Sequence, residues 1–289
     1  MARVMVTDIH IHVQPWDQLK PAVRDVLRAG HEDHWEFLQS LATDPSILLA
    51  EMDRSGIDRV GLVNYVSPDV MGFDDSTNDF VARYAAHSPE RLLPIGSAHP
   101  KYTKDPVAAV DRLVDLGIRC FKIHPCHQVF PANAYTDGLD ALGKIYARCE
   151  ERGLPIMIHT GTSIFPGARS KYGKPMEIDD VAIDYPDLTI LMAHGGRPLW
   201  TDEAFFVLRR HPNVSLDLSG IPPKKLLAYF PRIEELAGRV LWGTDWPSPG
   251  VRSLGSNLAQ FMDLPLSDTF KRGATVETPL RLFPVRPGT

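Results

Sequence analysis

Cysteine is scarce in this sequence, with three residues in 289, and neither a long apolar run nor a basic cluster is present. Three cysteines are too few, and odd in number, for a disulfide framework, so we expect reduced thiols. No apolar stretch approaches the length of a membrane span, and the N-terminus lacks a basic segment followed by an apolar one. Together with a net charge of −5, these absences argue against nucleic acid and membrane as partners. They predict a cytoplasmic or otherwise intracellular protein.

The sequence does contain a regular alternation of short apolar runs with segments of helical periodicity. Hydrophobic residues make up 44% of the chain, enough for a large core. Strands and helices in alternation are typical of a parallel sheet covered by helices, and eight such units fit one (β/α)8 barrel, a TIM barrel, over residues 1–289. An open doubly wound sheet would show a Gly-rich turn after its first strand, which is missing here. The expected strands are Val4–His12, Arg59–Tyr65, Leu92–Ala98, Ile118–His124, Leu154–His159, Leu188–His194, Val214–Leu218 and Val240–Asp245. The expected helices include Ile47–Arg54, Pro106–Leu116, Leu139–Arg152, Glu177–Tyr185 and Asp202–Arg210.

Two segments fall outside this alternation. Residues 13–44 make the first connection too long for a single helix, so we expect an insertion after the first strand. Connections that follow the strands of a barrel lie over its active site, which makes this insertion a candidate lid. The second segment, around residues 267–283, predicts a C-terminal helical extension.

Histidine and aspartate stand at the carboxyl ends of several expected strands. The first strand ends in an Asp-Ile-His-Ile-His motif, where alternation along a strand puts His10 and His12 on one face and the two isoleucines on the other. The fifth, sixth and eighth strands end at His159, His194 and Asp245. The carboxyl ends of the strands of a parallel barrel meet at one mouth, so these side chains should converge. Imidazoles with a carboxylate suit Zn²⁺ best among divalent ions, with Mn²⁺, Fe²⁺ and Co²⁺ as alternatives.

These motifs resemble those of the amidohydrolase superfamily, in particular the branch that contains aminocarboxymuconate-semialdehyde decarboxylase and small metal-dependent hydrolases. The resemblance implies that His10, His12, His159 and Asp245 hold one divalent metal ion. It also implies that His194 orients the reacting water or polarises the bond to be broken, while Asp245 acts as general base and then as general acid. The resemblance covers essentially the whole chain and rests on the motif at 8–12, Lys-Ile-His-Pro at 122–125, His-Thr-Gly at 159–161, Ala-His-Gly-Gly at 193–196 and Gly-Thr-Asp-Trp-Pro at 243–247.

Lys122 permits a second interpretation of the metal count. Binuclear members of the superfamily bridge two metals with a carboxylated lysine on the fourth strand, and they use the histidines of the fifth and sixth strands, here His159 and His194. Alternatively, Lys122 stays an ammonium that binds a substrate carboxylate. We favour one metal, because the branch that the chain resembles implies one. Further candidates for contacts with the substrate are His124, Arg197 and Trp246.

One set of ligands serves two reactions. We favour hydrolysis of an amide, ester or lactone bond in a small, carboxylate-bearing substrate, since a Lys-Ile-His-Pro motif on the fourth strand is typical of the hydrolase-like members. The alternative is non-oxidative decarboxylation of an aromatic or muconate-type acid. Two further alternatives need no catalytic metal, a metal-independent lactonase and a barrel that only binds its ligand, but the intact ligand positions argue against both. Dimers are common among such proteins, which makes a homodimer the assembly to test.

Overall fold

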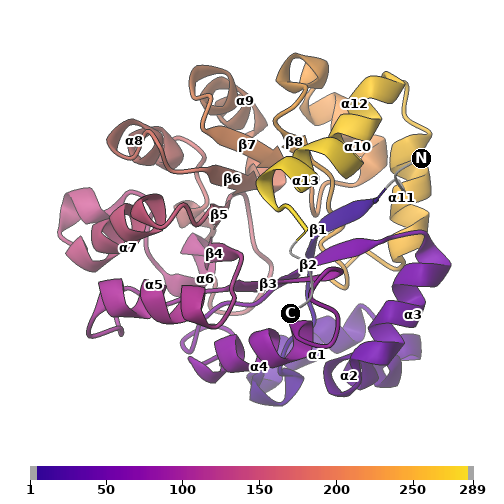
Figure 1. The fold of residues 1–289 in the computed structure, drawn as a ribbon, viewed down its shortest axis with the longest axis horizontal. Helices are drawn as coiled ribbons and strands as arrows, with labels where there is room; N and C mark the ends of the chain where they lie inside the picture. Colours follow the sequence, from indigo (N-terminus) through magenta and orange to yellow (C-terminus); the bar gives the residue numbers. More distant parts are fainter. Residues whose placement is uncertain (1–4, 286–289) are drawn as a thin grey trace.

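The computed structural model describes residues 5–285, in which eight parallel strands follow one another around a barrel (Figure 1). Each strand pairs in parallel with the next one along the chain, from the first to the eighth. The strands are β1 (Thr7–Ile11), β2 (Arg59–Val63), β3 (Leu92–Gly96), β4 (Cys120–Ile123), β5 (Ile156–His159), β6 (Ile190–Ala193), β7 (Val214–Asp217) and β8 (Val240–Leu241).

The barrel closes between β1 and β8. The backbone N–H of Ile9 donates to the carbonyl of Trp242 at 3.1 Å, and that of His12 donates to the carbonyl of Trp246 at 2.7 Å. Ile11 and Trp246 also form a parallel bridge. The predicted (β/α)8 barrel is therefore confirmed, and the carboxyl ends of all eight strands surround one mouth.

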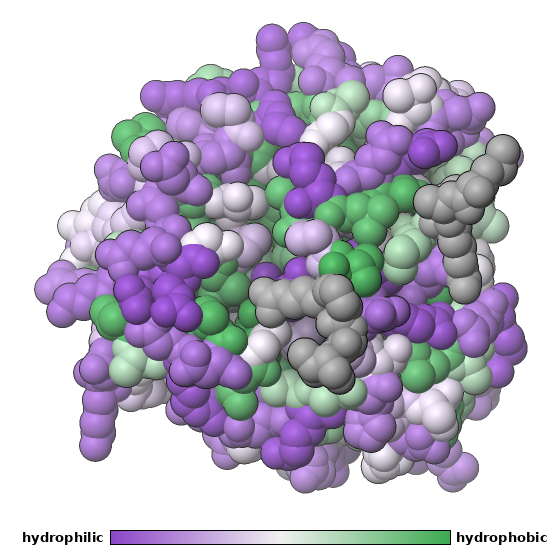
Figure 2. Space-filling view, in the orientation of Figure 1, coloured by the Kyte–Doolittle hydropathy of each residue, from purple (hydrophilic) through white to green (hydrophobic). Residues whose placement is uncertain are grey.

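Helices lie around the outside of the barrel (Figure 1). They include α3 (Pro45–Ser55), α4 (Ser76–Ala85), α5 (Pro106–Asp115), α7 (Asp140–Glu151), α8 (Glu177–Asp184), α9 (Thr201–Arg210) and α10 (Pro223–Tyr229). The short α6 (Pro125–Gln128) instead lies buried at the mouth, directly after β4. The five helices expected from the sequence are present as α3, α5, α7, α8 and α9, whereas α4, α6 and α10 were not expected. On the face drawn in Figure 2, hydrophilic residues predominate and hydrophobic ones are scattered among them.

Asp-Pro pairs begin two of these helices. Asp44 accepts the N–H of Ser46 at 2.8 Å before α3, and Asp105 accepts the N–H of Ala108 at 3.0 Å before α5. An aspartate at this position satisfies a free N–H of the first turn, and the proline after it has a backbone angle suited to a helix start. Gly56 ends α3 in the left-handed conformation, at a φ of 70°, and turns the chain toward β2.

Apolar side chains pack in two layers, one inside the barrel and one between the barrel and its helices. Ile9 and Met157 belong to the inner layer, whereas Ile11 belongs to the outer one. The prediction that both isoleucines of the first motif share a face is therefore wrong. The register of β1 against β2 shifts between Asp8 and Ile11, and such a β-bulge breaks the alternation of side chains. His10 lies within this bulge, so the bulge helps to set the direction in which the His10 side chain points.

The insertion after β1 contains α1 (Pro21–Ala29) and α2 (Trp35–Thr43). Its residues Trp16 and Leu27 pack in the same layer as Phe73, which follows β2. His31 Nε2 lies 2.7 Å from the carbonyl oxygen of Pro247, which follows β8. None of residues 13–44 lines the cavity at the barrel mouth, so the structure does not support the expected lid. The insertion instead supports the walls of the mouth from outside.

The C-terminal helical extension is present as predicted. After β8 the chain forms α11 (Leu254–Met262), α12 (Asp268–Arg272), a π-helical turn and α13 (Thr278–Leu282). Phe283 packs in the inner layer, and its carbonyl accepts a hydrogen bond from Arg59 Nη2 at 2.9 Å. Because Arg59 begins β2, this segment covers the end of the barrel opposite the mouth. No helix within residues 5–285 is long and apolar enough to cross a membrane.

Candidate metal centre and cavity

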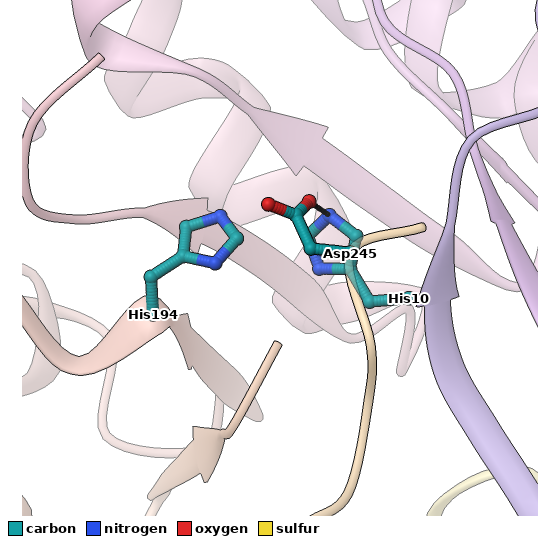
Figure 3. A group of neighbouring side chains, drawn as sticks. All are labelled: His10, His194 and Asp245. Carbon is teal, nitrogen blue, oxygen red and sulfur yellow. Dashed lines mark ion pairs between the residues drawn. The ribbon is translucent and has the colours of Figure 1, made fainter. Parts of the chain in front are cut away.

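Three side chains from separate strand ends meet at the mouth of the barrel. His10 lies on β1, His194 follows β6 and Asp245 follows β8. Each offers one potential ligand atom, and these atoms lie within 4.8 Å of one another. Figure 3 shows the carboxylate of Asp245 beside the ring of His10, with the ring of His194 facing them. The expected convergence of strand ends is therefore real, and it includes His194, to which the resemblance assigned a catalytic role.

A buried carboxylate fixes the orientation of His10. The Nδ1 atom of His10 lies 2.6 Å from Asp217 Oδ2, at the end of β7, and 2.9 Å from the hydroxyl of Ser219. Burial raises the pKa of Asp217, but the neighbouring His10 outweighs this effect and holds the pKa below its usual value. The ionised carboxylate keeps the proton of His10 on Nδ1, so the lone pair of Nε2 faces Asp245 Oδ1, 3.5 Å away.

His12 faces the same carboxylate with a second lone pair. Its Nδ1 donates to the carbonyl of Val63 at 3.1 Å, and its Nε2 lies 3.1 Å from Asp245 Oδ1. A neutral imidazole has one donor and one acceptor nitrogen, so Nε2 carries no proton when Nδ1 donates. In their neutral forms His10 and His12 direct two imidazole lone pairs at one carboxylate oxygen, so that three acceptor atoms converge. A cation among these atoms would satisfy them, and imidazole and carboxylate donors suit a divalent metal ion.

His194 presents its ring in the same way. Its Nδ1 donates to the carbonyl of Ser219 at 2.7 Å, which leaves Nε2 as an acceptor. Burial holds the pKa of His194 well below the usual value, so the ring is neutral near pH 7. His194 and Asp245 both have left-handed backbone conformations, with φ of 68° and 67°. Residues other than glycine rarely adopt this conformation, and it is often found at functional sites.

His159 is the predicted ligand whose ring has no partner. It is 5% exposed, and neither ring nitrogen makes a hydrogen bond to the described residues. Its ring centre lies 4.7 Å from that of His194. Burial lowers the pKa of His159 well below its usual value, so it too is a neutral imidazole. A buried polar ring without a partner is costly, and a ligand in the site would satisfy it. The donor groups fit a divalent cation between His10, His194 and Asp245, with His12 beside Asp245 and His159 beside His194 as further donors in reach of the site.

Lys122 lies beside this centre with its charge uncompensated. The side chain is 1% exposed, and its Nζ has no hydrogen-bond partner among residues 5–285. Burial lowers the pKa of Lys122 to about 8, although Asp217 and Asp245 act in the opposite direction. A fraction of the amine is therefore neutral near pH 7, as carboxylation would require, and the ammonium form would bind an anion. The geometry fits both interpretations of Lys122.

A cavity of about 490 Å³ opens from these residues to solvent. His124 lines it, with its ring stacked 3.9 Å from that of His159. Arg197 lines it as well, and its Nη2 lies 3.4 Å from Asp245 Oδ2. Trp246, the third predicted substrate contact, is not among the lining residues and packs in the outer apolar layer, 4% exposed. Its tryptophan ring therefore stabilises the fold, and its carbonyl holds the backbone of the first histidine motif.

The structure adds a polar triad that sequence reasoning missed. Tyr65 OH lies 2.8 Å from His127 Nδ1, and His127 Nε2 lies 2.7 Å from Ser163 Oγ. All three residues line the cavity, and the rings of His127 and His124 are stacked 3.6 Å apart. Burial holds the pKa of the Tyr65 phenol well above its usual value, so the hydroxyl stays protonated. The available signal was a second histidine, His127, three residues after His124 in the segment that follows the fourth strand.

Asp217 and Ser219, which orient His10, were also missed. Asp217 is the last residue of β7, and Ser219 lies two positions after it. The predicted strand ended at the apolar Leu218, so it offered no candidate ligand or catalytic residue at its carboxyl end. The available signal was a charged residue, Asp217, between two leucines on an otherwise apolar barrel strand.

Comparison with known proteins gives a family match over nearly the whole chain. The model of a family described as amidohydrolase matches residues 7–285. No curated protein matches the sequence.

Solved structures share the fold. An uncharacterised TIM-barrel protein from Bordetella bronchiseptica superposes with a TM-score of 0.77 and 23% identity, over 96% of this chain and 98% of that chain. A 4-oxalomesaconate hydratase from Rhodopseudomonas palustris superposes with a TM-score of 0.64 and 16% identity, over 97% of this chain and 96% of that chain. A 5-carboxyvanillate decarboxylase from Novosphingobium aromaticivorans superposes with a TM-score of 0.62 and 15% identity, over 97% of this chain and 95% of that chain. That structure is a complex with manganese and a nitrobenzoic acid. At these identities the likeness establishes the fold alone.

Proposed function

We propose, from the premise that this chain belongs to the amidohydrolase family, that it is a metal-dependent carboxy-lyase that removes CO₂ from a small carboxylic acid. The observation that carries the proposal is the pair of cationic side chains, Lys122 and Arg197, which line the cavity together with the convergent acceptor atoms. A carboxylate bound by these cations would lie next to the centre that holds the metal.

The choice of reaction differs from the one that the sequence favoured. Strand-four motifs favoured hydrolysis, but a decarboxylase and a hydratase are among the proteins that share the fold, and both names denote lyases rather than hydrolases.

His10, His12, His159 and Asp245 are the residues that we propose to hold the ion, with His194 as the alternative to His159. A divalent cation there would act as a Lewis acid that polarises a substrate oxygen and neutralises developing negative charge. Zn²⁺ suits the imidazole-rich donors, and Mn²⁺ is favoured by its presence in the decarboxylase that shares the fold. One metal leaves Lys122 free to hold the substrate.

Decarboxylation requires that a proton replaces the departing carboxylate. The bond to the carboxyl carbon breaks, its electron pair stays on the remaining carbon, and a proton is added there. Burial raises the pKa of Asp245, but the surrounding histidines, His194 first, hold it well below its usual value, so Asp245 starts as a carboxylate. We propose that Asp245 takes up one proton from solvent as the substrate carboxylate binds and donates it to that carbon, while His194 hydrogen-bonds the substrate.

Hydrolysis is the second candidate, and a specific arrangement favours it. Lys122, His159 and His194 all line the same cavity, as a second metal ion bridged by a carboxylated lysine would require. In that case two metals per chain would be bound, and Asp245 would act as base and then acid toward water. The metal count therefore separates the two candidates before any substrate is known.

The test combines metal analysis with a search for product. Protein loaded with Mn²⁺ or Zn²⁺ is offered a panel of aromatic and unsaturated carboxylic acids, with release of CO₂ as the readout, and in parallel a panel of esters and lactones. Decarboxylation in D₂O should place one deuterium on the carbon that lost CO₂, as seen by NMR, with about one metal per chain. Ester or lactone cleavage with two metals per chain would replace the proposal by hydrolysis. Full activity of either kind after chelation would point to the metal-independent alternatives.

A further inference from the structure

The cavity extends well beyond the candidate metal centre. Its outer part is lined by the start of α10, by the connection after β8 and by one side of α11. The side chains of α11 that line it recur every three or four residues, as expected for one face of a helix, and they are all polar. These residues are Ser253, which caps the helix, Ser256, Asn257 and Gln260.

Positive charge is concentrated along this cavity. Lys122 and Arg197 line its inner end, and Lys224 and Arg252 line its outer end. Asp245 is the one acidic side chain among the lining residues, and it already contacts two histidines and Arg197. The chain as a whole has a net charge of −5, so the cavity has the opposite sign to the rest of the protein. Such a field attracts anions into the cavity.

The two outer cations are free to bind a ligand. Lys224 lies in the first turn of α10, and Arg252 directly precedes Ser253, the residue that caps α11. Both are exposed, and within residues 5–285 neither takes part in an ion pair or a side-chain hydrogen bond. The positive end of the α11 dipole lies beside Arg252 and adds to its field. The outer end of the cavity therefore offers two cations and several amide or hydroxyl groups to one ligand.

We propose that the substrate carries a second anionic group, remote from the carboxylate that reacts, and that Lys224 and Arg252 bind this second group at the cavity mouth. The proposal rests on the carboxy-lyase function and makes it more specific. The substrate class is a dianion with its two charged groups at opposite ends of the molecule. Lys122 and Arg197 hold the reacting carboxylate, and the polar face of α11 contacts the part between.

The expected effect of each outer cation is modest. Exposed charge pairs contribute little, because solvent and salt screen them, so we expect about a twofold to fivefold loss of affinity for each cation removed. Removal of both should weaken binding of a dianion about tenfold. Binding of a monocarboxylate, which reaches only the inner cations, should not change.

The probes for the test are simple linear carboxylates. Binding of butyrate and hexanoate is compared with that of dicarboxylates from malonate to suberate, by calorimetry on the Mn²⁺-loaded full-length protein at low ionic strength. The variants are Lys224→Ala, Arg252→Ala and the double variant. The matched control is Lys225→Ala, because Lys225 is exposed on the same helix but does not line the cavity. We expect a gain in affinity for dicarboxylates above a certain chain length, lost in the double variant and kept in the control.

The outcomes separate this proposal from the function on which it rests. If dicarboxylates of all lengths bind no better than monocarboxylates of equal length, the outer site is refuted while the carboxy-lyase proposal stands. The same conclusion follows if the gain is equal in the double variant and in Lys225→Ala. If no carboxylate of either kind binds, both proposals fail.

Discussion

Replacement of Asp217 by asparagine tests the metal centre at a residue that would not touch the metal. Asp217 is fully buried, and each of its carboxylate oxygens accepts a hydrogen bond. Oδ2 accepts from His10 Nδ1 at 2.6 Å, and Oδ1 accepts the backbone N–H of Ser219 at 2.9 Å. Asparagine keeps one acceptor and gains an NH₂ donor. Whichever way the amide turns, a donor therefore faces either His10 Nδ1 or the Ser219 N–H.

The magnitude follows from these two contacts. If the NH₂ faces His10, Nδ1 must become the acceptor, the proton moves to Nε2, and the lone pair toward the metal is lost. If it faces Ser219, His10 keeps its tautomer but loses a charge-assisted bond, of which the net worth is about 1.5–3 kcal/mol. Partners of this kind typically contribute 10–100-fold to metal affinity, or about 1.4–2.7 kcal/mol. We therefore expect the affinity of Asp217→Asn for Zn²⁺ or Mn²⁺ to fall at least tenfold.

Competition with a fluorescent chelator measures that affinity, and circular dichroism checks that the variant is folded. Asp115→Asn is the matched control, because it removes the same charge from an exposed position of α5. If folded Asp217→Asn binds metal as tightly as the control variant does, then Asp217 does not set the tautomer of His10. The assignment of His10 Nε2 as a ligand atom would then be wrong.

Three further predictions concern separate parts of the molecule. His159→Ala should lose both bound metal and activity, measured by elemental analysis and turnover, and unchanged metal content would contradict its assignment as a ligand. Tyr65→Phe should leave metal content unchanged and lower the free energy of unfolding by about 1–3 kcal/mol, since it strips His127 Nδ1 of its partner; equal denaturant midpoints would argue against that contact. Burial raises the pKa of Glu177 to about 7. Ionisation of Glu177 therefore lowers the free energy of unfolding as pH rises from about 4.5 to 7. Glu177→Gln should raise Tm at pH 8 but not near pH 5, and an equal shift of Tm at both pH values would refute this reasoning.

The sequence contained most of the fold because the strands of a barrel are short apolar runs at regular spacing. All eight were located, with the largest error at β8, predicted as Val240–Asp245 and observed as Val240–Leu241. That strand ends early because the chain turns to bring Asp245 into the mouth. The helix α4 escaped notice because Ser-Thr-Asn-Asp at its start is typical of a loop. Its helical conformation depends on packing against β3, which periodicity does not report.

The site was less predictable, since a motif identifies a side chain but not its neighbours. His10, His12 and Asp245 were found because they end strands, and any parallel barrel brings strand ends together. Asp217 could not be paired with His10 from sequence, because the two are 207 positions apart and meet only when β7 and β1 close the same ring. Trp246 illustrates the opposite error, a motif residue next to the site that faces the outer layer.

The left-handed backbone at His194 and Asp245 explains how these two side chains reach a common point. On a regular strand, a side chain stands roughly perpendicular to the barrel wall and would leave the mouth open. His194 directly follows β6, whereas Asp245 lies four positions after the end of β8, and a left-handed residue at either point turns the chain over the mouth. Glycine adopts this conformation without strain, and the sequence offers it at Gly195, one position after His194, where φ is 52°. The turn nevertheless begins at the histidine itself. The fold thus accepts backbone strain at two positions that bear the proposed chemistry, and Gly195 beside one of them needs no such strain.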